Sequence, residues 1–164
     1  MKKFVLAAVV AAVAVPAAAA PGDTDSETGT ANATIVSPIS VTHTSGAALE
    51  FGVIVPDSAS PGTVTVSTAG VRSVSGVVGL AGITTSADSF LVQGETGRSF
   101  SFTTNGGTLT SGGNSMTFVT TTSASGGTIV SGGNTFTVGG TLTVGAALAA
   151  GSYSGSYTAT ATYN

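Results

Sequence analysis

The sequence predicts an all-β protein, an antiparallel immunoglobulin-like β-sandwich of about 8–9 short strands. Apolar and hydroxyl side chains alternate with a period of two, as they do in strands that bury one face. Clusters of Gly, Ser, Asn and Pro separate these runs at intervals of about 8–12 residues, which is typical of turns between short strands. After the N-terminus, no segment has the periodicity of a long amphipathic helix.

The N-terminus has the pattern of a bacterial signal peptide. Lys2 and Lys3 precede an unbroken apolar run over residues 4–15, which is shorter than the ~20 residues that a membrane span needs. Ala17 and Ala19 form the A-x-A arrangement that signal peptidase reads, so we place cleavage after Ala19. The predicted organisation is a signal peptide over residues 1–19, an acidic flexible linker over 20–32 and a single β-sandwich domain over 33–164. We therefore expect export to the periplasm, cell surface or medium, with no membrane span in the mature chain.

Composition excludes one class of partner. The chain has four Lys and Arg residues against seven Asp and Glu, and removal of the signal peptide leaves only Arg72 and Arg98. Nucleic-acid binding needs basic side chains that neutralise phosphates, so we exclude this partner. Cysteine is absent, which excludes a disulfide framework, a thiolate metal site and a cysteine nucleophile.

Alternation identifies the longest predicted strands. In the first run, Pro38 has no N–H to donate, so we expect that strand to lie at a sheet edge or to be broken by a bulge. The chain closes on the longest alternation, with Tyr153, Tyr157 and Tyr163 on one face and Ser and Thr on the other. The apolar positions of the first two runs are Ala33, Ile35, Ile39 and Val41, and then Leu49, Phe51, Val53 and Val55.

Shorter apolar pairs and glycine-rich turns fill the middle of the chain. Residues 105–107 read Asn-Gly-Gly, a strong hairpin signal because Asn and Gly readily adopt positive φ. Residues 111–114 and 131–134 both read Ser-Gly-Gly-Asn, and each precedes a short apolar strand. We interpret these as two hairpins with the same turn chemistry, since a solenoid needs at least three repeats.

No catalytic site emerges from the sequence. His43 is the only histidine, it ends the first predicted strand, and no G-x-S-x-G motif accompanies it, so we expect a polar strand-end residue rather than a general base. Asp88 and Glu95 fall near strand ends, where solvated side chains are expected, and no two acids form a pair. We predict a protein that is not an enzyme, with no catalytic, cofactor-binding or metal site and no cofactor.

Two charged features have ordinary interpretations. Asp23, Asp25 and Glu27 are spaced like half of a calcium loop, but the required Gly and closing Glu are missing, so a solvated linker is the better interpretation. Glu95 and Arg98 flank a turn and could pair, which at an exposed site contributes no more than about 1 kcal/mol.

The surface suggests association. Sheet proteins guard their edges with charge, especially Lys, and the predicted mature chain has no Lys. We expect self-association or pairing with other envelope proteins, although short twisted edges could be protection enough. The possible assembly strands carry Ile35, Ile39, Val41, Tyr153, Tyr157 and Tyr163.

Six segments are informative as a set: residues 33–41 (ATIVSPISV), 49–56 (LEFGVIVP), 62–66 (GTVTV), 90–95 (FLVQGE), 138–142 (VGGTL) and 151–164 (GSYSGSYTATATYN). Together they resemble an uncharacterised secreted bacterial family, the domain of unknown function 4402. The resemblance covers essentially the whole mature chain, and it implies no activity and no catalytic residues.

More distantly, the L-x-F-G segment at Leu49 and the G-x-Y-S-G-x-Y segment at Gly151 are similar to those of chaperone–usher pilins and spore-coat-U-type subunits. This resemblance implies an immunoglobulin-like fold completed by a neighbour's strand. The chain lacks the cysteines that such pilins often carry. The segment ahead of Ala33 is acidic and polar, and we do not expect it to serve as an apolar donor strand.

The leading functional hypothesis is a non-enzymatic secreted structural or surface subunit, pilin-like, that assembles through edge strands. The alternative is a soluble periplasmic or extracellular module that binds carbohydrate or protein. A small outer-membrane β-barrel is a second alternative, disfavoured because several runs have only two apolar positions and cannot build a tall lipid-facing band.

Overall fold

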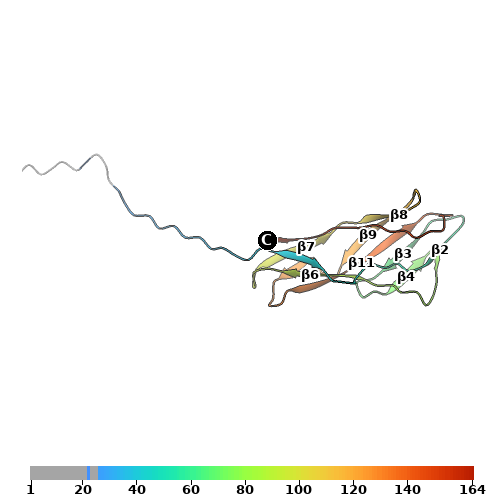
Figure 1. Ribbon diagram of the computed structural model, residues 1–164, viewed down its shortest axis with the longest axis horizontal. Helices are drawn as coiled ribbons and strands as arrows, with labels where there is room; N and C mark the ends of the chain where they lie inside the picture. The colour runs from blue at the N-terminus through green and yellow to red at the C-terminus, as the bar shows by residue number, and fades with distance from the viewer. Residues whose placement is uncertain (1–21, 23–25) are drawn as a thin grey trace, which may run out of the picture. The chain divides into compact units, whose positions relative to one another are not determined.

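The computed structural model describes residue 22 and residues 26–164, and in this part of the chain it contains twelve strands and no helix (Figure 1). All strand pairs are antiparallel, so the predicted all-β antiparallel fold is confirmed. The strand count exceeds the prediction because three-residue strands are too short to show an alternation. The strands are β1 (Ser40–His43), β2 (Ile54–Pro56), β3 (Gly62–Val66), β4 (Arg72–Ser75), β5 (Val77–Gly79), β6 (Asp88–Gln93), β7 (Ser99–Thr104), β8 (Gly107–Ser111), β9 (Asn114–Thr122), β10 (Gly126–Thr128), β11 (Asn134–Val144) and β12 (Ala159–Tyr163).

The long strand β11 organises the larger, seven-stranded sheet. Its first half pairs with β6 and its second half with β3, while β9 pairs along its centre. Val138 pairs with both β6 and β9, and Leu142 with both β3 and β9, so β6 and β3 share one edge of β11 and β9 takes the other. β1 continues the sheet beyond β6, β4 continues it beyond β3, and β8 continues it beyond β9.

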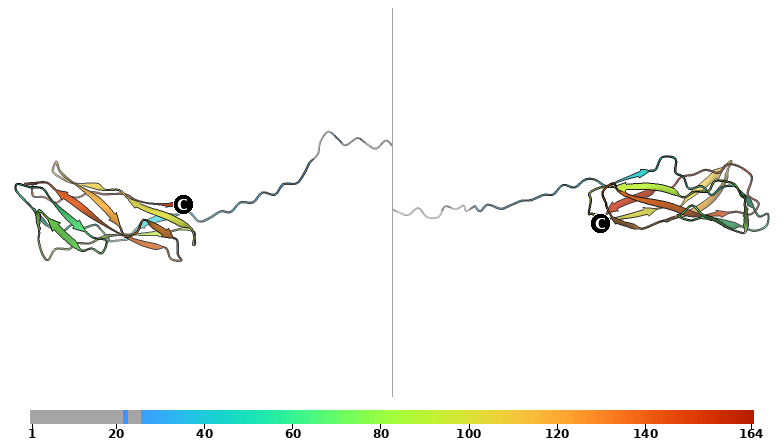
Figure 2. Two further views of the ribbon diagram at one scale, coloured as in Figure 1. Left: turned by 180° about the vertical axis from the view of Figure 1, so that it is seen from behind. Right: turned by 90° about the horizontal axis from the view of Figure 1, so that it is seen from below.

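A three-stranded sheet in the order β10-β7-β12 packs face to face on the larger one. The ring of Phe102 on β7 stacks on that of Phe136 on β11, with centroids 4.4 Å apart, and Phe100 meets the same ring edge-on. Strands β2 and β5 form a separate two-stranded ribbon. Figure 2 shows the strands from behind and from below.

The core consists of two clusters, which follow from the predicted inward positions. The first cluster packs residues of β3, β9 and β11 against Phe51, and the second lies between the two sheets. Tyr157 packs against both clusters and joins them. The first cluster contains Phe51, Val64, Val66, Met116, Phe118, Leu142 and Val144, and the second contains Phe90, Val92, Phe100, Phe102, Ile129, Phe136 and Val138.

The turn predictions have mixed outcomes. Gly112 and Gly113 have φ of 53° and 89° and close the β8–β9 hairpin, as the sequence predicts. The hairpin predicted at residues 105–107 is wrong, because β7 pairs with β10 and β12 while β8 pairs with β9, so this segment carries the chain from one sheet to the other. Residues 131–134 also connect the two sheets, since β10 pairs with β7 and not with β11.

Three runs with clear alternation are strands over only part of their length. The first run is a strand only from Ser40, and residues 26–39 have no regular structure. Residues 49–53 contain one isolated bridge, at Glu50, and residues 153–158 contain one, at Ser154. The physical reason is the same in each case: the alternation sets the faces of the strand, but no neighbouring strand is present to complete the ladder.

The strands all belong to the compact unit Ile35–Asn164. β1 pairs only with β6 and is an edge strand, as Pro38 predicts. Before this unit, residues 26–34 are exposed and form no regular structure. The predicted signal peptide and its cleavage position, and the acids Asp23 and Asp25, lie outside the described residues. No helix in the described part of the chain could span a bilayer.

Candidate binding groove

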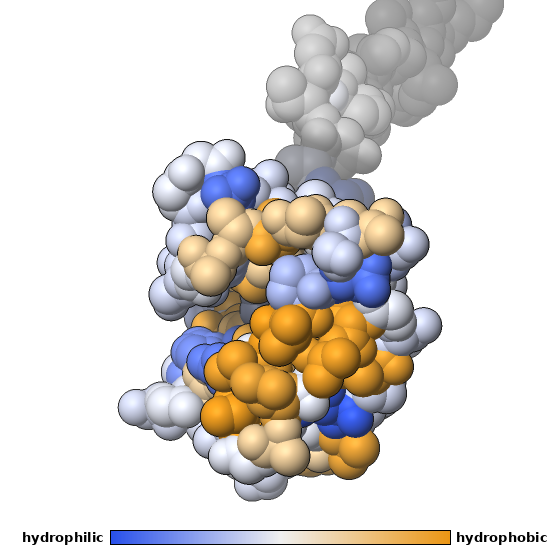
Figure 3. Space-filling model, turned by 90° about the vertical axis from the view of Figure 1, so that its right-hand side faces the viewer, coloured by the Kyte–Doolittle hydropathy of each residue, from blue (hydrophilic) through white to orange (hydrophobic). Residues whose placement is uncertain are grey.

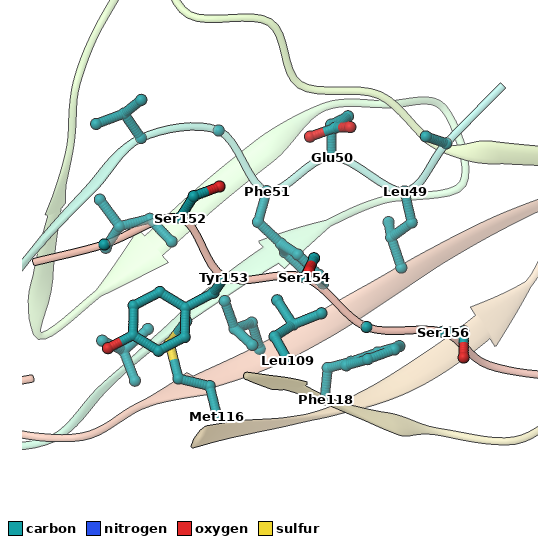
Figure 4. A pocket seen from close by; sticks show the side chains of 18 of the residues that line it. Leu49, Glu50, Phe51, Leu109, Met116, Phe118, Ser152, Tyr153, Ser154 and Ser156 are labelled. Carbon is teal, nitrogen blue, oxygen red and sulfur yellow. The ribbon is translucent and has the colours of Figure 1, made fainter. Parts of the chain in front are cut away.

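A groove of about 1090 Å³ opens over the first core cluster. Two irregular segments border it, residues 49–53 (the first rim) and residues 152–157 (the second rim). Figure 4 shows the two rims running in opposite directions, with apolar side chains gathered along them. The floor consists of Leu109, Met116, Phe118, Leu142 and Val144.

Each rim is bonded to the rest of the fold on its outer side. On the first rim, the backbone of Glu50 exchanges hydrogen bonds of 2.9 and 3.2 Å with Ser86. On the second rim, the backbone of Ser154 exchanges bonds of 2.9 and 3.2 Å with Thr110. These are the only isolated bridges among the described residues.

The inner side of the second rim therefore presents free backbone groups. Successive residues of an extended chain direct their N–H and C=O groups to opposite sides. Because Ser154 faces Thr110, its neighbours Tyr153 and Gly155 face the groove, and their backbone groups have no backbone partner in the described part of the chain. A strand placed between the rims would run parallel to one and antiparallel to the other.

Arg72 fixes the first rim in place. Its guanidinium donates from Nη2 to the carbonyl of Leu80 at 2.7 Å and, over 3.4 Å each, from Nη1 to the carbonyls of Phe51 and Val53. Gly52 has a φ of +77°, and a Cβ at this position would lie 2.7 Å from Arg72 Nη1. The rim thus needs glycine here both for its backbone conformation and for the close approach of Arg72.

A polar cluster lies at one end of the groove. Asp88 is only 5% exposed, and its carboxylate accepts hydrogen bonds from His43 Nε2 at 2.6 Å, from Tyr157 Oη at 2.7 Å and from the Ser89 amide at 2.7 Å. The expectation that Asp88 is solvated is wrong, because it begins β6 with its side chain turned inward between the two core clusters. His43 ends β1, as predicted, and its ring nitrogen positions this carboxylate.

The environment of Tyr157 changes its ionisation. Burial, and then the hydrogen bond to the Asp88 carboxylate and its negative charge, raise the pKa of Tyr157 far above its ordinary value of 10.0. The folded state therefore keeps this proton at a pH where the unfolded chain loses it.

This difference predicts loss of stability in alkali. Above about pH 10 the unfolded state binds fewer protons than the folded state, so the free energy of unfolding must fall as pH rises. We expect the melting temperature to fall more steeply between pH 10 and 11.5 in the native protein than in Tyr157→Phe. Calorimetry across this range measures the two slopes, and equal slopes would contradict the assignment.

The predicted assembly residues lie in different environments. Ile35 is 96% exposed, whereas Ile39 and Val41 pack against the second core cluster. Tyr153 and Tyr157 border the groove. Tyr163 lies on β12, where its hydroxyl donates to the Ser37 carbonyl at 2.8 Å and accepts from the Glu95 amide at 2.6 Å.

The contacts of Glu95 test its predicted pairing with Arg98. The Glu95 carboxylate accepts a hydrogen bond from the Ser37 amide at 3.3 Å, and no ion pair with Arg98 forms among the described residues.

Sequence reasoning missed the buried role of Asp88 and the groove floor, although Leu109 and Met116 do show the apolar alternation of β8 and β9. No group of three or more His, Cys, Asp or Glu residues within the described ranges could hold a metal ion.

An exposed aliphatic patch adjoins the first rim. Val55 on β2 and Val78 on β5 pair across the ribbon and are 46% and 60% exposed, and Val53 and Leu80 extend this face. Figure 3 shows hydrophobic residues gathered at this end of the molecule.

Comparison with known families agrees with the resemblance in the sequence. A family model described as a domain of unknown function (DUF4402) matches residues 39–163. The chain belongs to this family. The DUF4402 match runs from just before β1 to the end of β12, so both rims, the groove floor and the Asp88 cluster lie within it. Comparison with curated proteins and with solved structures gives no match.

Proposed function

We propose that this DUF4402 protein is an exported, non-enzymatic structural subunit of the cell envelope or surface, pilin-like in that a neighbouring subunit inserts an extended strand into its groove. One observation carries the proposal: the backbone of the second rim is paired on one side only, at Ser154, and this rim borders a groove with an apolar floor. An inserted strand would gain backbone bonds along the second rim while alternate side chains cover the floor.

The energetics favour occupation of the groove. Burial of apolar surface contributes about 25 cal/mol per Å², and unpaired strand edges attract further strands. The described residues offer little charge to prevent this, because their only basic side chains are Arg72 and Arg98 and Arg72 is bonded to backbone carbonyls. A soluble module that binds carbohydrate or protein would instead keep the groove open to solvent.

Hydrogen exchange tests the proposal with an internal control. In material isolated from the native source, we expect the amides of Tyr153 and Gly155 to be protected at least about tenfold more than in the purified monomer, because they gain a backbone partner. The Ser154 amide already donates to Thr110 and should be protected in both forms. Quenched exchange read by NMR measures each amide.

Fractionation of the source cells completes this test. Recovery in a surface or envelope fraction, as assemblies larger than a monomer, would support the proposed role. A monomer recovered from the medium or periplasm, with Tyr153 and Gly155 exchanging freely, would contradict it and favour the binding module.

A further inference from the structure

We infer that Asn105 is a site of spontaneous covalent modification, where the side-chain amide is lost and the backbone rearranges to isoaspartate, and that this change loosens the second rim. The inference goes beyond the proposed function and does not depend on what enters the groove. It starts from residues 105–106 (the connector), which belong to no strand and carry the chain from β7 to β8.

The reaction needs only the connector and water. The Gly106 backbone nitrogen gives its proton to solvent and bonds to the side-chain carbonyl carbon of Asn105, while the side-chain nitrogen takes up a proton and leaves as ammonia. Water then opens the resulting succinimide ring at either carbonyl, which yields aspartate or isoaspartate. Glycine favours ring closure because it has no side chain to hinder its nitrogen. Asn105 is the only Asn of the sequence that is followed by Gly.

Both reacting groups are free within the described part of the chain. Asn105 and Gly106 are exposed, the Gly106 amide donates no backbone hydrogen bond there, and the Asn105 side chain has no hydrogen-bond partner there. Asn134 differs, because its Oδ1 accepts from the Val130 amide at 3.3 Å and its Nδ2 donates to the Thr128 carbonyl at 3.2 Å. The local structure therefore leaves Asn105 able to react and holds Asn134.

Ring closure requires the connector to open. It turns the peptide bond between Asn105 and Gly106, and two hydrogen bonds resist this turn. The Asn105 amide donates to the Thr158 carbonyl at 3.1 Å, and Thr120 Oγ1 donates to the Asn105 carbonyl at 3.1 Å. Exposed segments with few backbone bonds open far more often than the whole fold unfolds. We therefore expect the folded chain to react, more slowly than an unfolded one.

Isoaspartate does not fit the closed connector. The main chain gains one carbon, and the former carbonyl of residue 105 becomes part of a charged carboxylate. The space beside the connector is already filled: a Cβ added to Gly106 would meet the Phe118 carbonyl oxygen, and one added to Gly107 would meet the Ser156 carbonyl oxygen. The longer chain must therefore move away from its present neighbours.

The second rim is attached through this connector. Thr158 directly follows the rim, and its carbonyl accepts from the Asn105 amide. A separate attachment lies at Ser154, which is bonded to Thr110. We expect isoaspartate to break the attachment at Thr158 and to leave the one at Ser154 intact. The change is permanent, because the ammonia that leaves is not restored.

Ageing of the purified protein tests the site. A folded chain of residues 20–164 is incubated at mildly alkaline pH, digested, and mapped by mass spectrometry with electron-transfer fragmentation, which distinguishes isoaspartate from aspartate. We expect Asn105 to convert at least about tenfold faster than Asn134, whose side chain is held by two hydrogen bonds. Asn105→Gln should stay unmodified, because its longer side chain closes a ring slowly. An intact Asn105 would overturn the inference.

A pair of substitutions on β9 tests the opening step. Thr120→Val removes the hydroxyl that is bonded to the Asn105 carbonyl, so it should raise the conversion rate about fivefold. Thr117→Val is the matched control, because Thr117 is exposed on the same strand, and it should leave the rate unchanged. Equal rates in these two variants would mean that the reaction does not pass through opening of the connector, and would overturn the inference.

Hydrogen exchange of the aged protein tests the effect on the rim. In the isoaspartate form, the amide of residue 105 should exchange at least about tenfold faster, while the Ser154 amide, which donates to Thr110, should be unchanged. Asn105→Asp supplies the charge without the added backbone carbon and should exchange like the native protein. If the aged protein also exchanges like the native one, or if Asn105→Asp exchanges as fast as the aged protein, the inference is overturned. These measurements use the monomer, so their outcome is independent of the proposed function.

Discussion

Phe102→Ala should lower the free energy of unfolding by about 3–5 kcal/mol, the usual cost of removing a buried phenylalanine side chain. Phe102 is 1% exposed, stacks on Phe136 and lies 6.1 Å from the ring of Phe90, so its ring joins the two sheets. The alanine variant would leave a cavity between the layers that neighbouring side chains on regular strands fill poorly. Urea denaturation of a chain of residues 20–164 measures the difference.

Val119→Ala is the matched control for this substitution. Val119 lies on β9 and is 63% exposed, so its truncation should change the free energy of unfolding by no more than about 0.5 kcal/mol. A cost below about 1 kcal/mol for Phe102→Ala would mean that the two sheets do not pack through this ring.

The sequence predicts the faces of the strands better than their partners. Phe90, Val92, Phe136 and Val138 alternate with hydroxyl-bearing and other residues, and all four are buried where the alternation places them. The same pattern is local, so it contains nothing about which strands pair. For this reason the Asn-Gly-Gly segment at residues 105–107 is read as a hairpin, although it connects two sheets.

The same holds for the groove: the sequence predicts which side chains face inward there, but not which segments pair. Alternation correctly gives the inward positions of Phe51 and Tyr153, but it predicts continuous strands on both rims. Ladder bonds need a neighbour at the right distance, and a sequence pattern is equally strong whether that neighbour lies in the same chain or in another. The strands that the sequence predicts at residues 49–53 and 153–158, and that lack a full ladder in the structure, border the groove.

Asp88 shows what composition cannot reveal. A lone acid at the start of a strand is solvated in most proteins, and nothing in the sequence links it to His43 or to Tyr157, which lie 45 and 69 residues away. The link depends on the pairing of β1 with β6 and on the packing of the second rim across both core clusters. Long-range placement of this kind is available only from the folded chain.

Asp88→Ala should lower the free energy of unfolding by about 2–4 kcal/mol, because removal of a buried carboxylate leaves the groups bonded to it without an acceptor. Tyr157 is one of these groups, since its hydroxyl donates to Asp88 from the end of the second rim. Asp88→Asn keeps an acceptor oxygen and should lose about half as much. Urea denaturation of both variants orders these costs.

A double-mutant cycle shows whether this effect acts through Tyr157. If the hydroxyl and the carboxylate stabilise each other, Asp88→Ala and Tyr157→Phe should be non-additive by about 1 kcal/mol or more, since each removes the same bond. Because this bond anchors the second rim, the amide of Ser154, which donates to Thr110, should exchange faster in Asp88→Ala than in the native protein. Additive costs with unchanged exchange at Ser154 would mean that the carboxylate stabilises the sandwich without positioning the rim.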